Sequence, residues 1–188
     1  MRAALTALIL LAGMAGALAA SVQERMAICF SCHGENGQSP NPETPSIGAQ
    51  PSPYVLIQLY LFRERQRVVD AMNQVTKGLT DKDLQAFSDA ISKLPAPQLT
   101  TEPGDPQRLQ RARDLVQKYR CGFCHQQNFS GQGNVPRIAA QREDYLLKAL
   151  RDYKSSVRPG YEPTMVEALQ PVSDVEIVDL AHLLARVQ

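Results

Sequence analysis

All four cysteines of this chain and two of its three histidines fall in two short motifs of the form Cys-x-x-Cys-His. Thiols at positions i and i+3 lie on one side of a helical turn, so both can add to the vinyl groups along one edge of a porphyrin. The next histidine then lies under the ring and offers a neutral imidazole nitrogen to the iron. This pattern is typical of covalent c-type haem attachment, and its repetition predicts two haems. The motif residues are Cys29, Cys32 and His33, and then Cys121, Cys124 and His125.

The sequence around the motifs repeats as well. The segment 45–50 recurs as 136–141, and Tyr54 recurs as Tyr145, both with an offset of 91 residues. Because the cofactor motif and its surroundings repeat together, each half of the chain is predicted to be one haem domain.

Length and composition agree with two small domains. The chain has 188 residues, of which 44% are hydrophobic and 21% are charged, an ordinary globular balance. Small domains bury a modest share of their surface, and a large apolar cofactor in each would complete its core. The net charge of +1 gives no reason to expect a nucleic-acid partner.

The first nineteen residues have the pattern of a targeting segment. A short positive start at Met1 and Arg2 precedes an uncharged apolar run over 3–15, and residues 17–19 read Ala-Leu-Ala, which fits a cleavage site. The apolar run is short for a membrane span, which needs roughly 20 residues. The alternative is an uncleaved N-terminal anchor, and both interpretations place the rest of the chain outside the cytoplasm.

Helical periodicity covers most of the remaining chain. Thr80, Asp105 and Ser173 each have the pattern of a helix cap, and Ser173 begins a capping box. Four prolines and a glycine within 95–106 predict a fairly stiff linker. The helices are expected over 22–31, 54–63, 81–94, 106–119, 145–153 and 174–184.

The predicted organisation is therefore an all-α protein with two tandem haem domains. It comprises a signal peptide at 1–19, a first haem c domain at 20–94, a Pro-rich linker at 95–106 and a second haem c domain at 107–188.

An iron held by one histidine still needs a ligand on its other face, and methionine commonly fills that position. Without the targeting segment the chain has only three methionines, and Met26 lies too close to Cys29 to reach the far face of the same haem. Met72 follows its motif histidine by 39 residues and Met165 by 40, and each precedes the cap of the last helix by eight. We therefore expect Met72 and Met165 to be axial ligands on loops between helices. The alternative is two methionines that fill gaps in the core.

Two other features allow more than one interpretation. His182 has no counterpart in the first half, and it is expected to be a partly buried or surface helix histidine; the alternatives are a haem ligand and a pH-sensing group. Basic residues cluster within 63–67 and 108–120, where they form either a solvated helix face or a surface that pairs with haem propionates or an acidic partner.

These motifs resemble those of the two-haem class I cytochromes c, most closely the cytochrome c4 family, over essentially all of residues 20–188. In the first half the resemblance rests on Cys29, Cys32, His33, Gly34, Gly37, Pro45, Ile47, Ala49, Gln50, Tyr54 and Met72, and the series recurs in the second half. The chain departs from the family at Ala49 and Ala140, where glycine is frequent, and at 65–67, where Arg-Gln-Arg replaces Gly-x-Arg.

The resemblance implies two class I cytochrome c domains related by pseudo-twofold symmetry and two covalent haem c groups. It also implies that the carbonyls of Pro45 and Pro136 accept the N–H of the proximal imidazoles. Such proteins carry electrons in the bacterial periplasm, between a respiratory or periplasmic dehydrogenase and a terminal oxidase or reductase. Peripheral association with the membrane would be through a membrane-bound partner.

Two other classes of function stay open. With both irons six-coordinate there is no open site for a substrate, so we expect an electron carrier and not an enzyme. The first alternative is a haem enzyme or enzyme subunit, such as a thiosulfate-oxidising cytochrome, in which one iron exchanges its methionine. The second is a thiol redox or zinc module built from the Cys-x-x-Cys pairs.

Overall fold

The computed structural model of the protein describes residues 20–158 and 163–188, and the expected signal peptide lies outside them. Within these ranges the chain is helical, with one isolated β-bridge between Gln132 and Val135 and no strand. The first half contains α1 (Val22–Arg25), α2 (Ala27–His33), a 3-10 turn (Glu35–Gly37), α3 (Ser52–Arg63), α4 (Asp70–Thr76) and α5 (Asp81–Ser92). The second contains α6 (Pro106–Lys118), α7 (Cys121–His125), α8 (Glu143–Lys154), α9 (Pro163–Leu169) and α10 (Asp174–Leu184).

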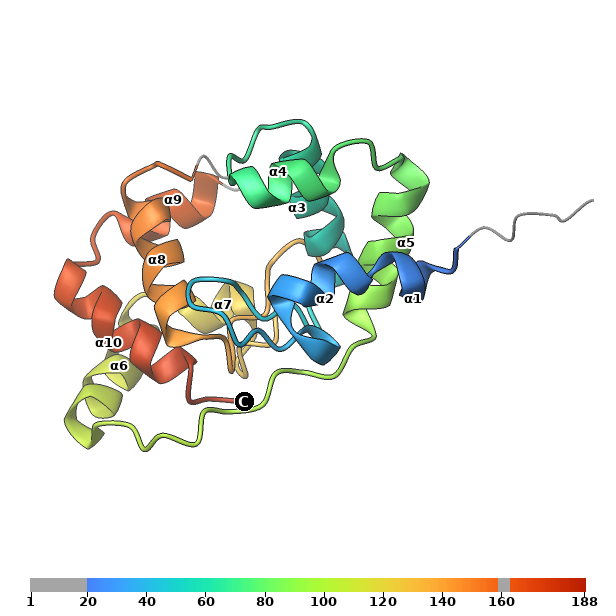
Figure 1. Cartoon of the computed structure of the whole chain (residues 1–188). Helices are drawn as coiled ribbons and strands as arrows, with labels where there is room; N and C mark the ends of the chain where they lie inside the picture. Colours follow the sequence, from blue (N-terminus) through green and yellow to red (C-terminus); the bar gives the residue numbers. More distant parts are fainter. Residues whose placement is uncertain (1–19, 159–162) are drawn as a thin grey trace, which may run out of the picture.

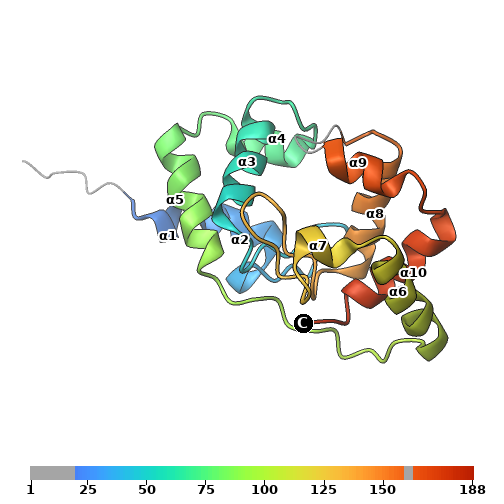
Figure 2. The same ribbon diagram turned by 180° about the vertical axis from the view of Figure 1, so that it is seen from behind.

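The two groups of helices lie side by side, and Figures 1 and 2 show them from opposite faces. Helices α1–α5 form one half and α6–α10 form the other, while the segment between α5 and α6 runs along one edge of the molecule. The short helices α2 and α7, which carry the Cys-x-x-Cys-His motifs, both lie toward the middle of the molecule.

The core of the first half forms where α3 packs on α5. Its buried members are Met26, Val55, Phe87 and Ile91. Met26 lies at the break between α1 and α2 and is 0% exposed. It is therefore a core side chain, which agrees with its exclusion from the ligand candidates.

The core of the second half is larger and forms where α10 packs on both α6 and α8. Helix α10 lies between two partner helices, and most of its circumference is therefore apolar and buried. The buried members are Ala112, Leu115, Val116, Leu146, Leu150, Leu169, Val172, Ile177, Leu180, Ala181, Leu183, Leu184 and Ala185.

The three predicted helix caps are confirmed, whereas the helix expected over 22–31 is broken at Met26 and the helices expected from 54 and 145 begin at Ser52 and Glu143. Thr80 and Ser173 each form a complete capping box, in which the side chain three residues later bonds back to the cap. The side chain of Asp105 accepts from the backbone N–H of Arg108, and Pro106 occupies the first turn of α6.

The segments around Met72 and Met165 differ from the prediction. Loops were expected there, but Met72 lies within α4 and Met165 within α9. Both helices have only seven residues, which is too short for an apolar periodicity to be recognised in the sequence.

Four non-glycine residues adopt left-handed backbone conformations at matched places in the two halves. Ala49 has φ 51° and Ala140 has φ 53°, while Arg65 has φ 56° and Ser156 has φ 57°. The left-handed conformation costs an L-residue roughly 1–2 kcal/mol. Glycine would therefore be favoured at Ala49, Ala140 and Arg65, and these three residues adopt the left-handed conformation without it.

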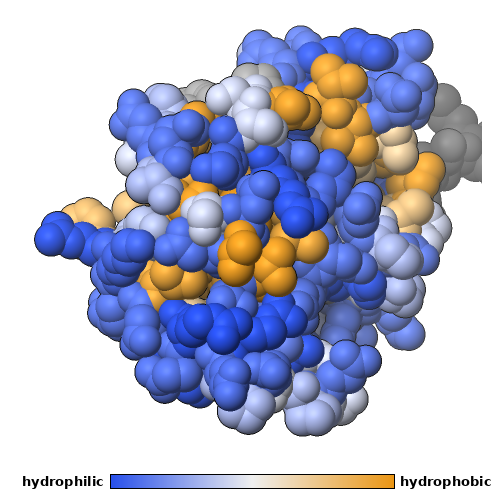
Figure 3. Space-filling model, turned by 90° about the vertical axis from the view of Figure 1, so that its left-hand side faces the viewer, coloured by the Kyte–Doolittle hydropathy of each residue, from blue (hydrophilic) through white to orange (hydrophobic). Residues whose placement is uncertain are grey.

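Most of the molecular surface in Figure 3 is hydrophilic, and its exposed apolar side chains gather in small separate patches. Among the described residues no helix is long and apolar enough to cross a membrane.

Candidate functional site

Each Cys-x-x-Cys-His motif forms a short helix that ends at its histidine. In α2, Cys29 is partly buried, Cys32 is exposed and His33 is only 7% exposed. Helix α7 repeats the arrangement, and His125 is again 7% exposed. All four cysteines are free, so neither pair forms a disulfide.

The two motif histidines are held in the same way. Nδ1 of His33 lies 2.8 Å from the carbonyl oxygen of Pro45, and Nδ1 of His125 lies 2.9 Å from that of Pro136. A carbonyl can only accept, so each Nδ1 carries the proton and each Nε2 keeps its lone pair. Burial lowers the pKa of both imidazoles more than these hydrogen bonds raise it, which favours the neutral ring. The expected proline contacts are confirmed, and each ring has an unprotonated Nε2 that can bind a metal.

Two of the four thiols lack the lowered pKa that is typical of reactive or metal-binding cysteines. Burial raises the pKa of Cys29 and Cys121, whereas a nucleophilic or metal-binding thiol has a lowered pKa. No group of three or more His, Cys, Asp or Glu side chains that could hold a metal ion occurs in the described part of the chain. The free thiols and oriented imidazoles fit haem c better than they fit a zinc site.

The candidate sixth ligands occupy equivalent helices. Met72 and Met165 are both partly buried, and Met165 packs against the core of the second half. Met26 has no such matched position, and its side chain is fully buried.

Two glutamines join the halves by reciprocal hydrogen bonds, and we call this contact the seam. The side-chain amide of Gln141 donates to the carbonyl of Ser46 and accepts from its N–H, both at 2.8 Å. Gln50 bonds to the backbone of Arg137 in the same way, at 2.9 and 3.0 Å. Gln50 and Gln141 occupy equivalent positions of the repeat, so the seam obeys the pseudo-twofold symmetry of the fold.

Replacing Gln141 by alanine should destabilise the protein by about 2 kcal/mol. The side chain is 5% exposed, and its loss leaves both backbone groups of Ser46 without these partners, at roughly 1–3 kcal/mol for a buried unsatisfied group. Denaturant unfolding of Gln141→Ala measures the loss, and Gln127→Ala, at an exposed position, is the control. Equal stability of the two variants would show that the seam contributes nothing.

The seam and its surroundings contain the functional candidates that sequence reasoning missed. Gln50 and Gln141 were recognised only as parts of a repeated segment, and Arg158 was not recognised at all. The offset of 91 that relates Tyr54 to Tyr145 also relates Arg67 to Arg158. This shared offset is the feature of the sequence that could have identified Arg158. Arg137 adds a buried side-chain Nε that has no hydrogen-bond partner.

His182 is a helix histidine, as expected, but with 5% exposure it is more deeply buried than expected. Its Nε2 accepts from the backbone N–H of Asp105 at 3.0 Å, and its Nδ1 lies 3.1 Å from a carboxylate oxygen of Glu143. Both ring nitrogens are engaged, which argues against the haem-ligand alternative. His182 instead ties the start of α6 to α8 and α10.

Most of the second basic cluster forms ion pairs within its own half. Arg108 and Arg111 bind the two carboxylate oxygens of buried Asp179, at 3.2 and 2.7 Å, and Lys118 binds Glu176 at 3.0 Å. These side chains therefore join α6 to α10, while Arg111 and Lys118 stay more than half exposed, as on a solvated helix face.

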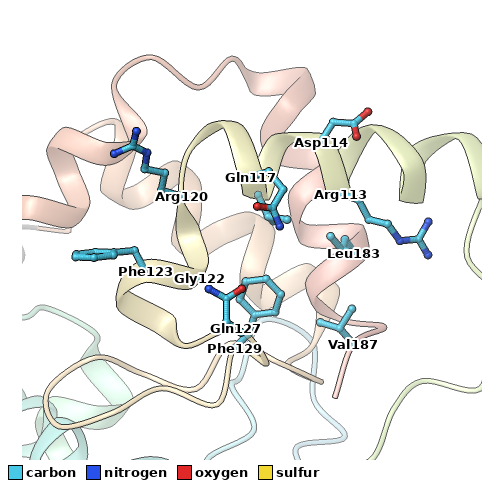
Figure 4. Close-up of a pocket in the computed structure, with 11 residues that line it drawn as sticks. Arg113, Asp114, Gln117, Arg120, Gly122, Phe123, Gln127, Phe129, Leu183 and Val187 are labelled. Carbon is cyan, nitrogen blue, oxygen red and sulfur yellow. The ribbon is translucent and has the colours of Figure 1, made fainter.

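A groove of about 510 Å³ lies beside α7, between α6 and the end of α10. Figure 4 shows Gln117 and Gln127 facing each other across it, with Phe129 and Leu183 along its floor. Neither the motif cysteines and histidine of the second half nor Met165 line it. Its lining does include Gly122 and Phe123, the two residues between the motif cysteines.

Comparison with known proteins shows which proteins the chain is similar to. No protein-family profile matches it. Four cytochromes c4 are 26–28% identical to it over most of its length. That of Pseudomonas aeruginosa is 26% identical over 79% of this chain and 77% of the relative.

Solved structures share the fold. Reduced recombinant cytochrome c4 from Pseudomonas stutzeri superimposes with a TM-score of 0.80 at 22% identity, over 89% of this chain and 97% of that one. The thiosulfate dehydrogenase TsdBA from Marichromatium purpuratum superimposes with a TM-score of 0.71 at 22% identity, and covers 85% of this chain but only 36% of that one.

The fold and its two matched motif helices define a protein of two tandem class I cytochrome c domains related by pseudo-twofold symmetry. Within this class the chain is similar to the cytochromes c4, and the resemblance predicted from its motifs is confirmed. Proteins of the cytochrome c4 family are electron carriers rather than enzymes, in agreement with the expectation from the sequence.

Proposed function

We propose that the chain is a periplasmic two-haem electron carrier. The observation that carries the proposal is the matched surroundings of His33 and His125. Each histidine follows two free thiols, and each donates its Nδ1–H to a proline carbonyl. Haem c, when attached, supplies an iron that gains and loses single electrons. The protein must therefore hold that iron and limit access to it, and it has no substrate to transform.

The residues have separate roles in this proposal. The cysteines at 29, 32, 121 and 124 would form the thioether links, and His33 and His125 would bind the iron through Nε2. Met72 and Met165 would supply the second protein ligand of each iron, which would leave neither iron open to a substrate. Residues 20–94 and 107–188 are the two haem domains, and 95–106 is the linker between them. The buried Nε of Arg137 is a donor that an anionic cofactor group would satisfy.

The partners are redox proteins: a respiratory or periplasmic dehydrogenase as donor, and a terminal oxidase or reductase as acceptor. Residues 1–19 direct export in this proposal, since c-type haem is attached outside the bacterial cytoplasm. The alternative is a haem subunit of a thiosulfate-oxidising enzyme. The likeness to TsdBA shows the fold alone and does not by itself favour that alternative.

A stoichiometric redox titration tests the carrier function. The purified holoprotein should take up two electrons, one per haem, and its spectra should show six-coordinate low-spin iron at both haems. Addition of thiosulfate should leave the oxidised protein unreduced. Reduction by thiosulfate, or high-spin iron at one haem, would favour the enzyme alternative.

A further inference from the structure

The two attachment helices differ at the positions between their cysteines. In the first motif Phe30 follows the first cysteine, and its ring packs against the core of the first half. The equivalent residue of the second motif is Gly122, which lines the groove of about 510 Å³ beside α7. The nearest atoms to a Cβ added at Gly122 would be those of the Gln127 side chain, at 3.4 and 3.5 Å, an ordinary contact. The missing side chain therefore leaves room beside α7 where the first half has an aromatic ring.

The groove lies behind the cysteine face of α7. Residues at i+1 and i+2 of a helical turn do not share the face of residues i and i+3. Gly122 and Phe123 consequently lie on the side of α7 that is turned away from Cys121 and Cys124, and the groove is lined by the first pair and not by the second. A molecule in the groove would contact the attachment helix without entering the space on its cysteine face.

The groove offers apolar surface to a partner. Phe123 is 83% exposed, more than any other large hydrophobic side chain among the described residues. In Figure 4 its ring extends at one end of the groove, and Phe129 and Leu183 form the floor. Aromatic side chains are enriched at the centres of protein interfaces, where they supply much of the binding energy.

The two ends of the groove carry positive charge. Arg120 lies at the end near Phe123 and Arg113 at the other. Neither guanidinium has a partner among the described carboxylates, whereas Arg108 of the same helix binds one at 3.2 Å. Asp114 is the one carboxylate of the lining, and in Figure 4 it points away from the floor. The charge of the groove therefore suits an acidic ligand.

The first half presents a different surface at these positions. With the offset of 92 that relates the motifs, Ser31 corresponds to Phe123 and Ile28 to Arg120. Neither the exposed aromatic ring nor this positive charge has a counterpart there, although the motif histidines and the seam are matched. A partner that needs both features would bind only the second half.

We propose that this groove is the docking site for an acidic segment of a redox partner protein. An apolar side chain of the segment covers the floor beside Phe123, and its carboxylates pair with Arg113 and Arg120. The inference rests on the proposed function, since a carrier must meet its partners. Guanidinium groups bind carboxylates through two parallel hydrogen bonds, and opposite charges speed the encounter. Because α7 carries both thiols of the second motif, a partner docked here would exchange electrons with the second half.

The test titrates the reduced, ¹⁵N-labelled holoprotein with the peptide acetyl-Glu-Asp-Phe-Asp-Glu-amide and follows the amide shifts by NMR. Saturable shifts should centre on Gln117, Gln127 and Phe129. They should weaken as salt is added, because exposed charges are screened. A peptide with alanine in place of phenylalanine, and one with lysine in place of every acidic residue, should each bind at least about tenfold more weakly.

Two substitutions change the shape of the groove. Gly122→Phe should abolish peptide binding, because it places the aromatic ring of the first motif in the groove. Phe123→Ala should weaken binding at least about tenfold, since it removes the exposed ring. Val175→Ala, at a position 72% exposed and outside the groove, should leave binding unchanged.

A further pair of variants tests the charges. Arg113→Gln combined with Arg120→Gln should weaken binding at least about tenfold and remove most of its salt dependence. Arg151→Gln, at an exposed arginine outside the groove, is the control. Haem content is measured on every variant, so that loss of folding is not mistaken for loss of the docking site.

The outcomes separate the two proposals. A purified protein without covalent haem would refute the proposed function, while its peptide shifts would still decide the docking site. Two haems with no shifts at the groove, or with shifts unchanged in Gly122→Phe, would overturn only the docking site. Equal binding of the acidic and the lysine peptides would overturn it as well. Shifts at the groove that depend on protein concentration without peptide, and that are lost in Gly122→Phe, would assign the groove to a second copy of the chain instead.

Discussion

Replacing Cys121 and Cys124 together by serine should halve the covalently bound haem. Each motif supplies both thiols for one haem in the proposed function, and serine cannot form the thioether. The purified variant should carry one haem by intact mass and by the pyridine haemochrome assay. It should take up one electron where the parent takes up two.

The matched variant in the first half, Cys29→Ser with Cys32→Ser, is the control for this experiment. It should lose the same amount of haem, because the two motifs are geometrically equivalent. Haem staining after denaturation distinguishes covalent from trapped haem in both variants. Two retained covalent haems in either variant would contradict the assignment of the thiols.

The sequence determines the local parts of this fold well. The capping residues Thr80, Asp105 and Ser173 were recognisable because a cap and the helix that it starts are neighbours in the chain. The partners of His33 and His125 were predictable because the family resemblance extends to the prolines 12 and 11 residues downstream. In each case the information lies within a dozen residues.

Contacts between distant segments could not be predicted in this way. Gln50 and Gln141 look like ordinary polar residues, and only the folded chain shows that each bonds to backbone some ninety residues away. Arg67 was noticed as one of three basic residues in 63–67, where two interpretations were open. The structure separates it from Arg63, which pairs with Glu64 and Asp81, and places it against Tyr145.

Two symmetric contacts join the halves, the seam and the hydrogen bonds of Arg67 to Tyr145 and of Arg158 to Tyr54, and they differ in physical character. The seam is neutral and joins side-chain amides to backbone, so its hydrogen bonds depend little on charge or on salt. The contact between the arginines and tyrosines is cationic, and its guanidinium groups also stack on the rings of Phe62 and Tyr153. The halves should therefore associate through the seam whatever the cofactor state.

Replacing Met72 by alanine should remove the sulfur–iron charge-transfer band in the near infrared at one haem and leave the other unchanged. The reduction potential of that haem should fall by on the order of 0.1 V, a fraction of the roughly 0.8 V range over which axial ligands set haem potentials. Met165→Ala should have the same effect at the other haem. The band intensity and a potentiometric titration measure both changes.

Met26→Ala is the control that separates ligation from packing. Met26 is 0% exposed and belongs to the core of the first half, so its truncation should destabilise the fold by about 2–5 kcal/mol. It should leave both near-infrared bands intact, because Met26 lies at the start of the attachment helix. Retention of both bands in Met72→Ala, together with a loss of stability like that of Met26→Ala, would mean that Met72 only fills the core. The iron of the first half would then have an open position, and the thiosulfate-oxidising alternative would have to be tested at that haem.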